Sequence, residues 1–129
     1  MHQEIDRELD DLARQVVDSA FSVHKALGPG LLESAYEICL GLELRGRGIA
    51  CLSQVPLDVT YRETTIESAF RLDLLVGDRL VVELKSVEQL LPIHEAQLLT
   101  YLRLSGNRLG LLINFNTALI KNGIKRLVI

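Results

Sequence analysis

The stretch RLVVELKSVEQL, residues 79–90, constrains the fold most strongly because it carries two opposite charges in an apolar strand. Its apolar residues alternate as they do in a strand that enters a protein interior. Glu83 and Lys85 are two positions apart, so they share one face of that strand. Charges in apolar surroundings are costly unless they are paired, hold an ion or do chemistry. The segment therefore predicts either a buried ion pair or a functional site.

The preceding strand, FRLDLLV, adds a third charge, Asp73. A two-residue loop between the strands would put Asp73 and Glu83 on opposite faces, whereas a three-residue loop, residues 77–79, sets them opposite each other. We predict the three-residue loop. The two carboxylates would then lie about 5 Å apart and would need a cation, supplied by Lys85 together with a hard divalent ion. The alternative is an Asp73–Lys85 ion pair with Glu83 at the sheet edge.

The rest of the pattern predicts one α/β (α+β) domain over residues 1–129. Apolar residues at helical spacing give two helices, the first ending at the GPG of residues 28–30. Three strands follow, then a helix from Pro92 to about Ser105, a nearly continuous apolar strand and a last short strand. The order ααβββαββ favours a mixed central β-sheet flanked by helices.

The third predicted helix carries a polar stripe of His94, Gln97 and Tyr101, spaced three and four apart. The stripe can lie over the end of the strand that holds Lys85, where Gln97 could hold a substrate phosphate or the attacking water. Each residue alone also fits an ordinary surface or half-buried position. The opposite side of this helix, Leu98, Leu99 and Leu102, is expected to face the core.

The second predicted helix begins in the segment GLLESAY, which contains Gly30, Glu33 and Tyr36. Glu33 falls in the first turn, where the helix dipole favours a carboxylate. A capping role explains Glu33 equally well, a helix-entry role explains Gly30, and a core position explains Tyr36.

Composition limits the possible functions. The net charge of −3 argues against a general nucleic-acid binder, although residues 79–129 hold 7 Lys and Arg against 3 Asp and Glu and could meet phosphate. No signal peptide and no run of about 18 apolar residues is present. Cys39 and Cys51 have no metal or disulfide spacing. We expect a cytoplasmic protein that does not enter a membrane.

These motifs in this order resemble the GxxExxY protein family. GLLESAY matches its signature, and FRLDLLV, VVELKSVEQL, PIHEAQLLTYL, GLLINFN and GIKRLV resemble its running pattern, so that the resemblance covers about residues 10–129. The family is placed in the PD-(D/E)XK nuclease superfamily, which implies a restriction-endonuclease-like core. Two departures stand out: Leu72 replaces the usual proline before Asp73, and Arg62-Glu63 replaces a Lys-Gly turn.

The resemblance also implies roles for the site residues. Asp73 corresponds to the metal-binding Asp, Glu83 and Lys85 to the E-x-K motif, and Gln97 with Tyr101 to a Q-x-x-x-Y motif. The backbone carbonyl of Leu84 would be a third metal ligand. In addition, Glu33 would join the metal shell, directly or through water, and His94, Gly30 and Tyr36 would support the site.

The implied function is a Mg²⁺-dependent nuclease, with Mn²⁺ as a substitute, that hydrolyses phosphodiester bonds of nucleic acid, DNA rather than RNA. Duplex cleavage by so small a domain would need a homodimer or a recruiting protein partner. Two alternatives stay open. The chain could be a catalytically silent nuclease-fold module that binds nucleic acid or a protein, or its charges could form a purely structural ion-pair network.

Overall fold

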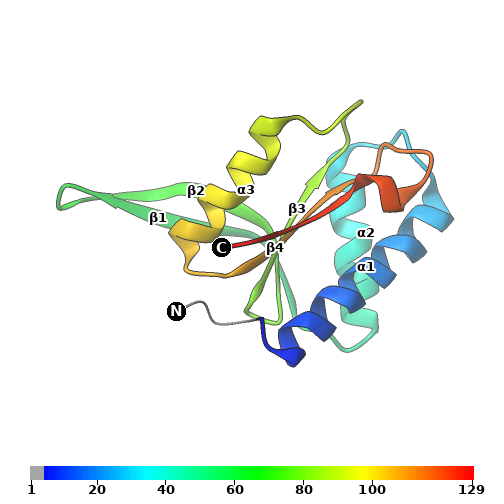
Figure 1. The fold of residues 1–129 in the computed structure, drawn as a ribbon, viewed down its shortest axis with the longest axis horizontal. Helices are drawn as coiled ribbons and strands as arrows, with labels where there is room; N and C mark the ends of the chain where they lie inside the picture. Colours follow the sequence, from blue (N-terminus) through cyan, green and yellow to red (C-terminus); the bar gives the residue numbers. More distant parts are fainter. Residues whose placement is uncertain (1–4) are drawn as a thin grey trace.

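The computed structural model describes residues 5–129, and its element order confirms the predicted ααβββαββ pattern with one short 3₁₀ turn added (Figure 1). Within these residues, no helix is long and apolar enough to cross a membrane. The elements are α1 (Arg7–Leu27), α2 (Glu33–Gly46), β1 (Cys51–Tyr61), β2 (Thr64–Val76), β3 (Leu80–Lys85), α3 (Pro92–Ser105), β4 (Leu109–Asn114), η1 (Ile120–Gly123) and β5 (Ile124–Val128).

The five strands form one mixed sheet in the order β1-β2-β3-β4-β5. The β3–β4 pair is parallel and the other three pairs are antiparallel. A parallel pair needs a crossover connection, and α3 supplies it. Strand β4 is buried along its whole length, which explains its nearly continuous apolar sequence.

The helices cover both faces of the sheet (Figure 1). On one face, α1 and α2 pack on alternate residues of β3, among them Val82 and Leu84. On the other face, Leu98 and Leu102 of α3 are fully buried against Val81. The prediction that Leu99 also faces the core is wrong: its side chain is 36% exposed, because it is one position round the helix from the buried pair, which is spaced four apart.

Strand β2 pairs with β3 along only part of its length. Its pairing with β3 runs from Val76↔Leu80 to Leu74↔Val82 and then ends. Beyond that point, β1 and β2 continue together as a two-stranded ribbon that projects from the body of the protein (Figure 1). The two strands β2 and β3 therefore separate at residues 73 and 83, and we call this place the fork.

Candidate active site

The fork brings Asp73 and Glu83 together. The turn between β2 and β3 has the predicted three residues, 77–79, and the register of the pairs before it places Asp73 opposite Glu83. The Asp73 backbone N–H donates to Oε1 of Glu83 at 3.1 Å, and the Leu84 N–H donates to Oδ2 of Asp73 at 2.9 Å. Beyond the last β2–β3 backbone pair, side-chain carboxyl groups therefore accept the backbone N–H groups of the two strands.

Glu83 is held in an environment that opposes its charge. Its side chain is buried, and burial is the main reason why its pKa rises to about 9. The charge of Asp73 and a hydrogen bond between the two carboxyl groups raise that pKa further, and Lys85 only partly offsets the rise. At neutral pH Glu83 consequently retains its proton when no added cation is present.

Two residues of the polar stripe of α3, Gln97 and Tyr101, lie at the end of β3. Lys85 Nζ donates to Oε1 of Gln97 at 3.1 Å, and Nε2 of Gln97 donates to the Tyr101 hydroxyl at 3.1 Å. The Tyr101 ring packs on Phe70 of β2, with 4.7 Å between ring centroids. Among residues 5–129, none of the salt bridges joins Lys85 to Asp73, so the alternative of an Asp73–Lys85 ion pair is not what the structure shows.

His94 lies at the beginning of α3, apart from the chain of contacts that starts at Lys85. Its Nδ1 accepts the Leu91 backbone N–H at 2.9 Å. The side chain thereby satisfies an amide at the helix start that has no partner within the helix. This contact gives His94 a local reason for its place in the sequence.

Gly30, Glu33 and Tyr36 have three separate roles around the loop before α2. Gly30 has φ of 102°, which residues with a β-carbon rarely adopt. The Tyr36 hydroxyl donates to the Gly28 carbonyl at 2.6 Å and accepts the Leu31 N–H at 3.1 Å, while its ring stacks on a phenylalanine of the core. Tyr36 thus fixes the loop that sets the start of α2.

The same loop is tied to the site strand and orients the first turn of α2. Ser86, which follows Lys85, donates from its hydroxyl to the Leu31 carbonyl at 2.6 Å. Partial burial raises the pKa of Glu33, Lys85 acts in the opposite direction, and Asp73 adds to the rise. Glu33 therefore lies within electrostatic reach of both site charges.

Two further polar residues near Asp73 were missed by the sequence analysis. Nε2 of Gln54 on β1 donates to Oε1 of Glu37 on α2 at 2.6 Å and lies 3.5 Å from Oδ1 of Asp73. Burial raises the pKa of Glu37, and the charges of Asp73 and Glu33 contribute to the rise. Glu37 is one helical turn after Glu33, a spacing that could have identified it, whereas Gln54 carries no such signal.

The donor set at the fork fits a small divalent ion. Within residues 5–129, no group of three or more His, Cys, Asp or Glu side chains is arranged to hold a metal. Mg²⁺, however, is commonly bound by one or two carboxylates together with waters and substrate phosphate. Two carboxyl groups that influence each other electrostatically, one of them with a pKa of about 9, are the arrangement that such a cation would stabilise.

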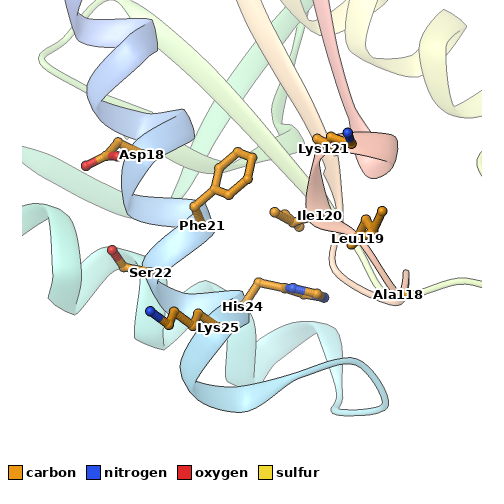
Figure 2. Close-up of a pocket in the computed structure, with 9 residues that line it drawn as sticks. All are labelled: Asp18, Phe21, Ser22, His24, Lys25, Ala118, Leu119, Ile120 and Lys121. Carbon is orange, nitrogen blue, oxygen red and sulfur yellow. The ribbon is translucent and has the colours of Figure 1, made fainter.

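The hollow shown in Figure 2 is a different place. It lies between the second half of α1 and the segment that contains η1, and Phe21, His24 and Leu119 are among its lining residues. It shares no residue with the fork. The lining has a single carboxylate, Asp18, and so offers no pair of acids comparable to that of the fork.

Comparison with protein-family models identifies the class. Residues 10–127 match the model of the PD-(D/E)XK nuclease superfamily. The chain belongs to this superfamily, and its mixed sheet flanked by helices is consistent with a restriction-endonuclease-like fold. Searches of curated proteins and of solved structures gave no match. Membership of the GxxExxY family stays a prediction.

Proposed function

We propose that this protein is a metal-dependent nuclease that hydrolyses phosphodiester bonds of nucleic acid, with DNA preferred over RNA. The observation that carries the proposal is that the Glu83 carboxyl group accepts the Asp73 N–H and the Asp73 carboxyl group accepts the Leu84 N–H at the fork. Lys85 lies on the same face of β3 as Glu83. A buried acid whose pKa is raised by burial and by a neighbouring carboxylate is stabilised in its charged form by a divalent cation. Membership of a nuclease superfamily supports the same conclusion.

Asp73 and Glu83 would hold Mg²⁺, or Mn²⁺ in its place. The Leu84 N–H points toward β2, and because a residue's N–H and C=O lie on the same edge of a strand, we expect its carbonyl to be available as a third ligand. Glu33 would act through water. The ion would supply Lewis acidity and lower the pKa of a bound water.

Lys85 would supply the protein's own positive charge at the site. Its ammonium group would orient the attacking water and stabilise negative charge on the phosphate oxygens in the transition state. Gln97 accepts a hydrogen bond from Lys85 and donates one to Tyr101. We therefore assign Gln97 and Tyr101 to holding the ammonium group in place, with the remaining Gln97 N–H free to reach phosphate or water.

The test combines binding and cleavage. Mn²⁺ and Mg²⁺ are titrated calorimetrically into the wild type and into Asp73→Asn, which keeps an acceptor oxygen for the Leu84 N–H. Cleavage is then measured on single-stranded, duplex and branched DNA and on RNA. Asp58→Asn is the matched control, since Asp58 also accepts a backbone N–H, that of Ser68, but lies on the ribbon.

We expect metal binding and metal-dependent cleavage in the wild type and in Asp58→Asn, and neither in Asp73→Asn. Binding without cleavage would identify the right site and point to a missing substrate or a recruiting partner. A folded wild type that binds no metal would contradict the proposal and favour the alternative, a silent module that binds nucleic acid or protein. Activity on duplex DNA that rises with protein concentration would support a homodimer.

A further inference from the structure

Gln54 on β1 adopts a backbone conformation that the pairing of the strands does not require. The β1–β2 register continues unchanged on both sides of it, since Ser53 pairs with Leu74 and Val55 pairs with Leu72. Gln54 nevertheless has φ of 51°. This is the left-handed region, which residues with a β-carbon adopt mainly in turns or under strain.

The other non-glycine residues with left-handed φ among residues 5–129 have local reasons for it. Arg62 and Glu63 form the turn between β1 and β2, and Asp78 lies in the turn between β2 and β3. Ser68 lies near the register shift of the ribbon, where its N–H donates to Asp58 at 2.8 Å. Gln54 has neither a turn nor a register shift to account for it.

What Gln54 does have is a place directly across from Asp73. Its side-chain amide donates to Glu37 at 2.6 Å and lies 3.5 Å from Oδ1 of Asp73, while Oδ2 of Asp73 accepts the Leu84 N–H. The Asp73 carboxylate is thus approached by a donor at each oxygen. Gln54 is itself exposed, so packing in the core is not what holds it in this conformation.

The side chains of β2 also change direction at this point. Leu72 packs in the cluster on the α3 face, and Leu74, two positions later, packs in the cluster on the α1–α2 face. In a regular strand these two side chains would share one face. The irregular backbone opposite Asp73 therefore coincides with a twist of β2 at the fork.

We infer that Gln54 is a positioning residue for Asp73, oriented by Glu37. Its left-handed backbone places the amide over Oδ1, and the acceptor on Glu37 holds the amide there. Together with the Leu84 N–H, this fixes the plane of the carboxylate that would meet the cation. The inference rests on the proposed function, because it concerns how the metal-binding acid is aimed.

The test uses Gln54→Gly, since glycine tolerates φ of 51° and keeps the backbone while the amide is removed. Arg62→Gly is the matched control: it changes a residue with φ of 48° on the same ribbon, at the turn. Three quantities are measured for each variant: the Kd for Mn²⁺ by calorimetry, the ¹³C chemical shift of the Asp73 carboxyl carbon in metal-free protein, and the midpoint of thermal unfolding.

We expect Gln54→Gly to raise the Kd for Mn²⁺ by about tenfold or more and to move the Asp73 carboxyl signal, without lowering the unfolding midpoint. Arg62→Gly should leave the Kd and the signal unchanged. Glu37→Ala should weaken Mn²⁺ binding as well, and Glu37→Gln, which keeps an acceptor oxygen for the amide, should weaken it less than Glu37→Ala does.

A wild-type Kd and an unmoved Asp73 signal in Gln54→Gly would overturn the inference. The nuclease proposal would survive that result as long as Asp73→Asn abolishes Mn²⁺ binding. If the wild type bound no Mn²⁺, the nuclease proposal would fail, and the metal-free carboxyl signal would still decide whether Gln54 positions Asp73.

Discussion

Carboxyl groups lie in opposite electrostatic environments in two regions of the protein, the start of α1 and the fork. Near the start of α1, Asp10 receives Arg126 of β5 at 2.7 Å, and the hydrogen bond from that guanidinium lowers its pKa. At the fork, Glu83 is buried and lies beside a second carboxyl group, that of Asp73, and both effects raise its pKa to about 9. In the first region a carboxylate is paired with a cationic side chain of the protein. In the second, the charged form of the carboxyl group would be stabilised by a bound cation.

The difference shows how to separate a structural charge from a functional one. A carboxylate that serves the fold is given a cationic partner and stays ionised at neutral pH. A carboxyl group that is placed against another acid in a buried position costs stability, and we take that cost as the mark of a ligand site. Charge count and sequence spacing alone could not have distinguished the two.

Among variants that keep both carboxyl groups of the fork, the largest effect on cleavage should come from Lys85. Replacing it in Lys85→Ala removes the ammonium group that would stabilise transition-state charge, and we expect cleavage to fall by about 10²–10³-fold while Mn²⁺ binds as tightly as before or more tightly. Lys125→Ala is the control, because that lysine pairs with Glu95 at 3.2 Å away from the fork. Cleavage by Lys85→Ala at the wild-type rate would contradict the role.

The smallest effect should come from the Asp10–Arg126 pair. Because the pKa of Asp10 is lowered in the folded state, its contribution to stability is present above the unfolded value of 3.8 and is lost as pH falls. Asp10→Asn should therefore change the free energy of unfolding only slightly at pH 7, and salt should reduce even that change. Denaturant unfolding of the wild type and Asp10→Asn at two salt concentrations measures this change. A large decrease in the free energy of unfolding that does not depend on salt would contradict the contrast between the two regions.

Much of the fork was predictable because a strand has only two faces. The positions of Glu83 and Lys85 on one face, together with the three-residue turn, determine that Asp73 lies opposite Glu83. Gln97 and Tyr101 followed from helical spacing in the same way. In these cases a local period and one turn length were sufficient.

The remaining parts depend on tertiary geometry. Gln54 reaches Asp73 through a backbone conformation that glutamine does not favour by itself, and no propensity announces it. His94 has the spacing of a site residue but binds the amide of Leu91 at the helix start. The prediction for Leu99 is wrong because helical spacing indicates which side of a helix is buried but not how wide the buried face is.

The most direct test of the central claim is the pH dependence of the free energy of unfolding, measured without metal for the wild type and for Glu83→Gln. The folded protein holds the Glu83 proton up to a pKa of about 9, whereas the unfolded chain releases it near 4.5. The native state then binds more protons between these values, so wild-type stability should fall as pH rises through that window.

Glu83→Gln keeps an acceptor for the Asp73 N–H and has no proton to lose. We therefore predict that it is more stable than the wild type at pH 8, that the fall with pH is largely removed, and that it no longer binds Mn²⁺. If Glu83→Gln were instead much less stable at pH 8, the ionised Glu83 would be serving the fold, and the account of the fork as a cation site would be contradicted.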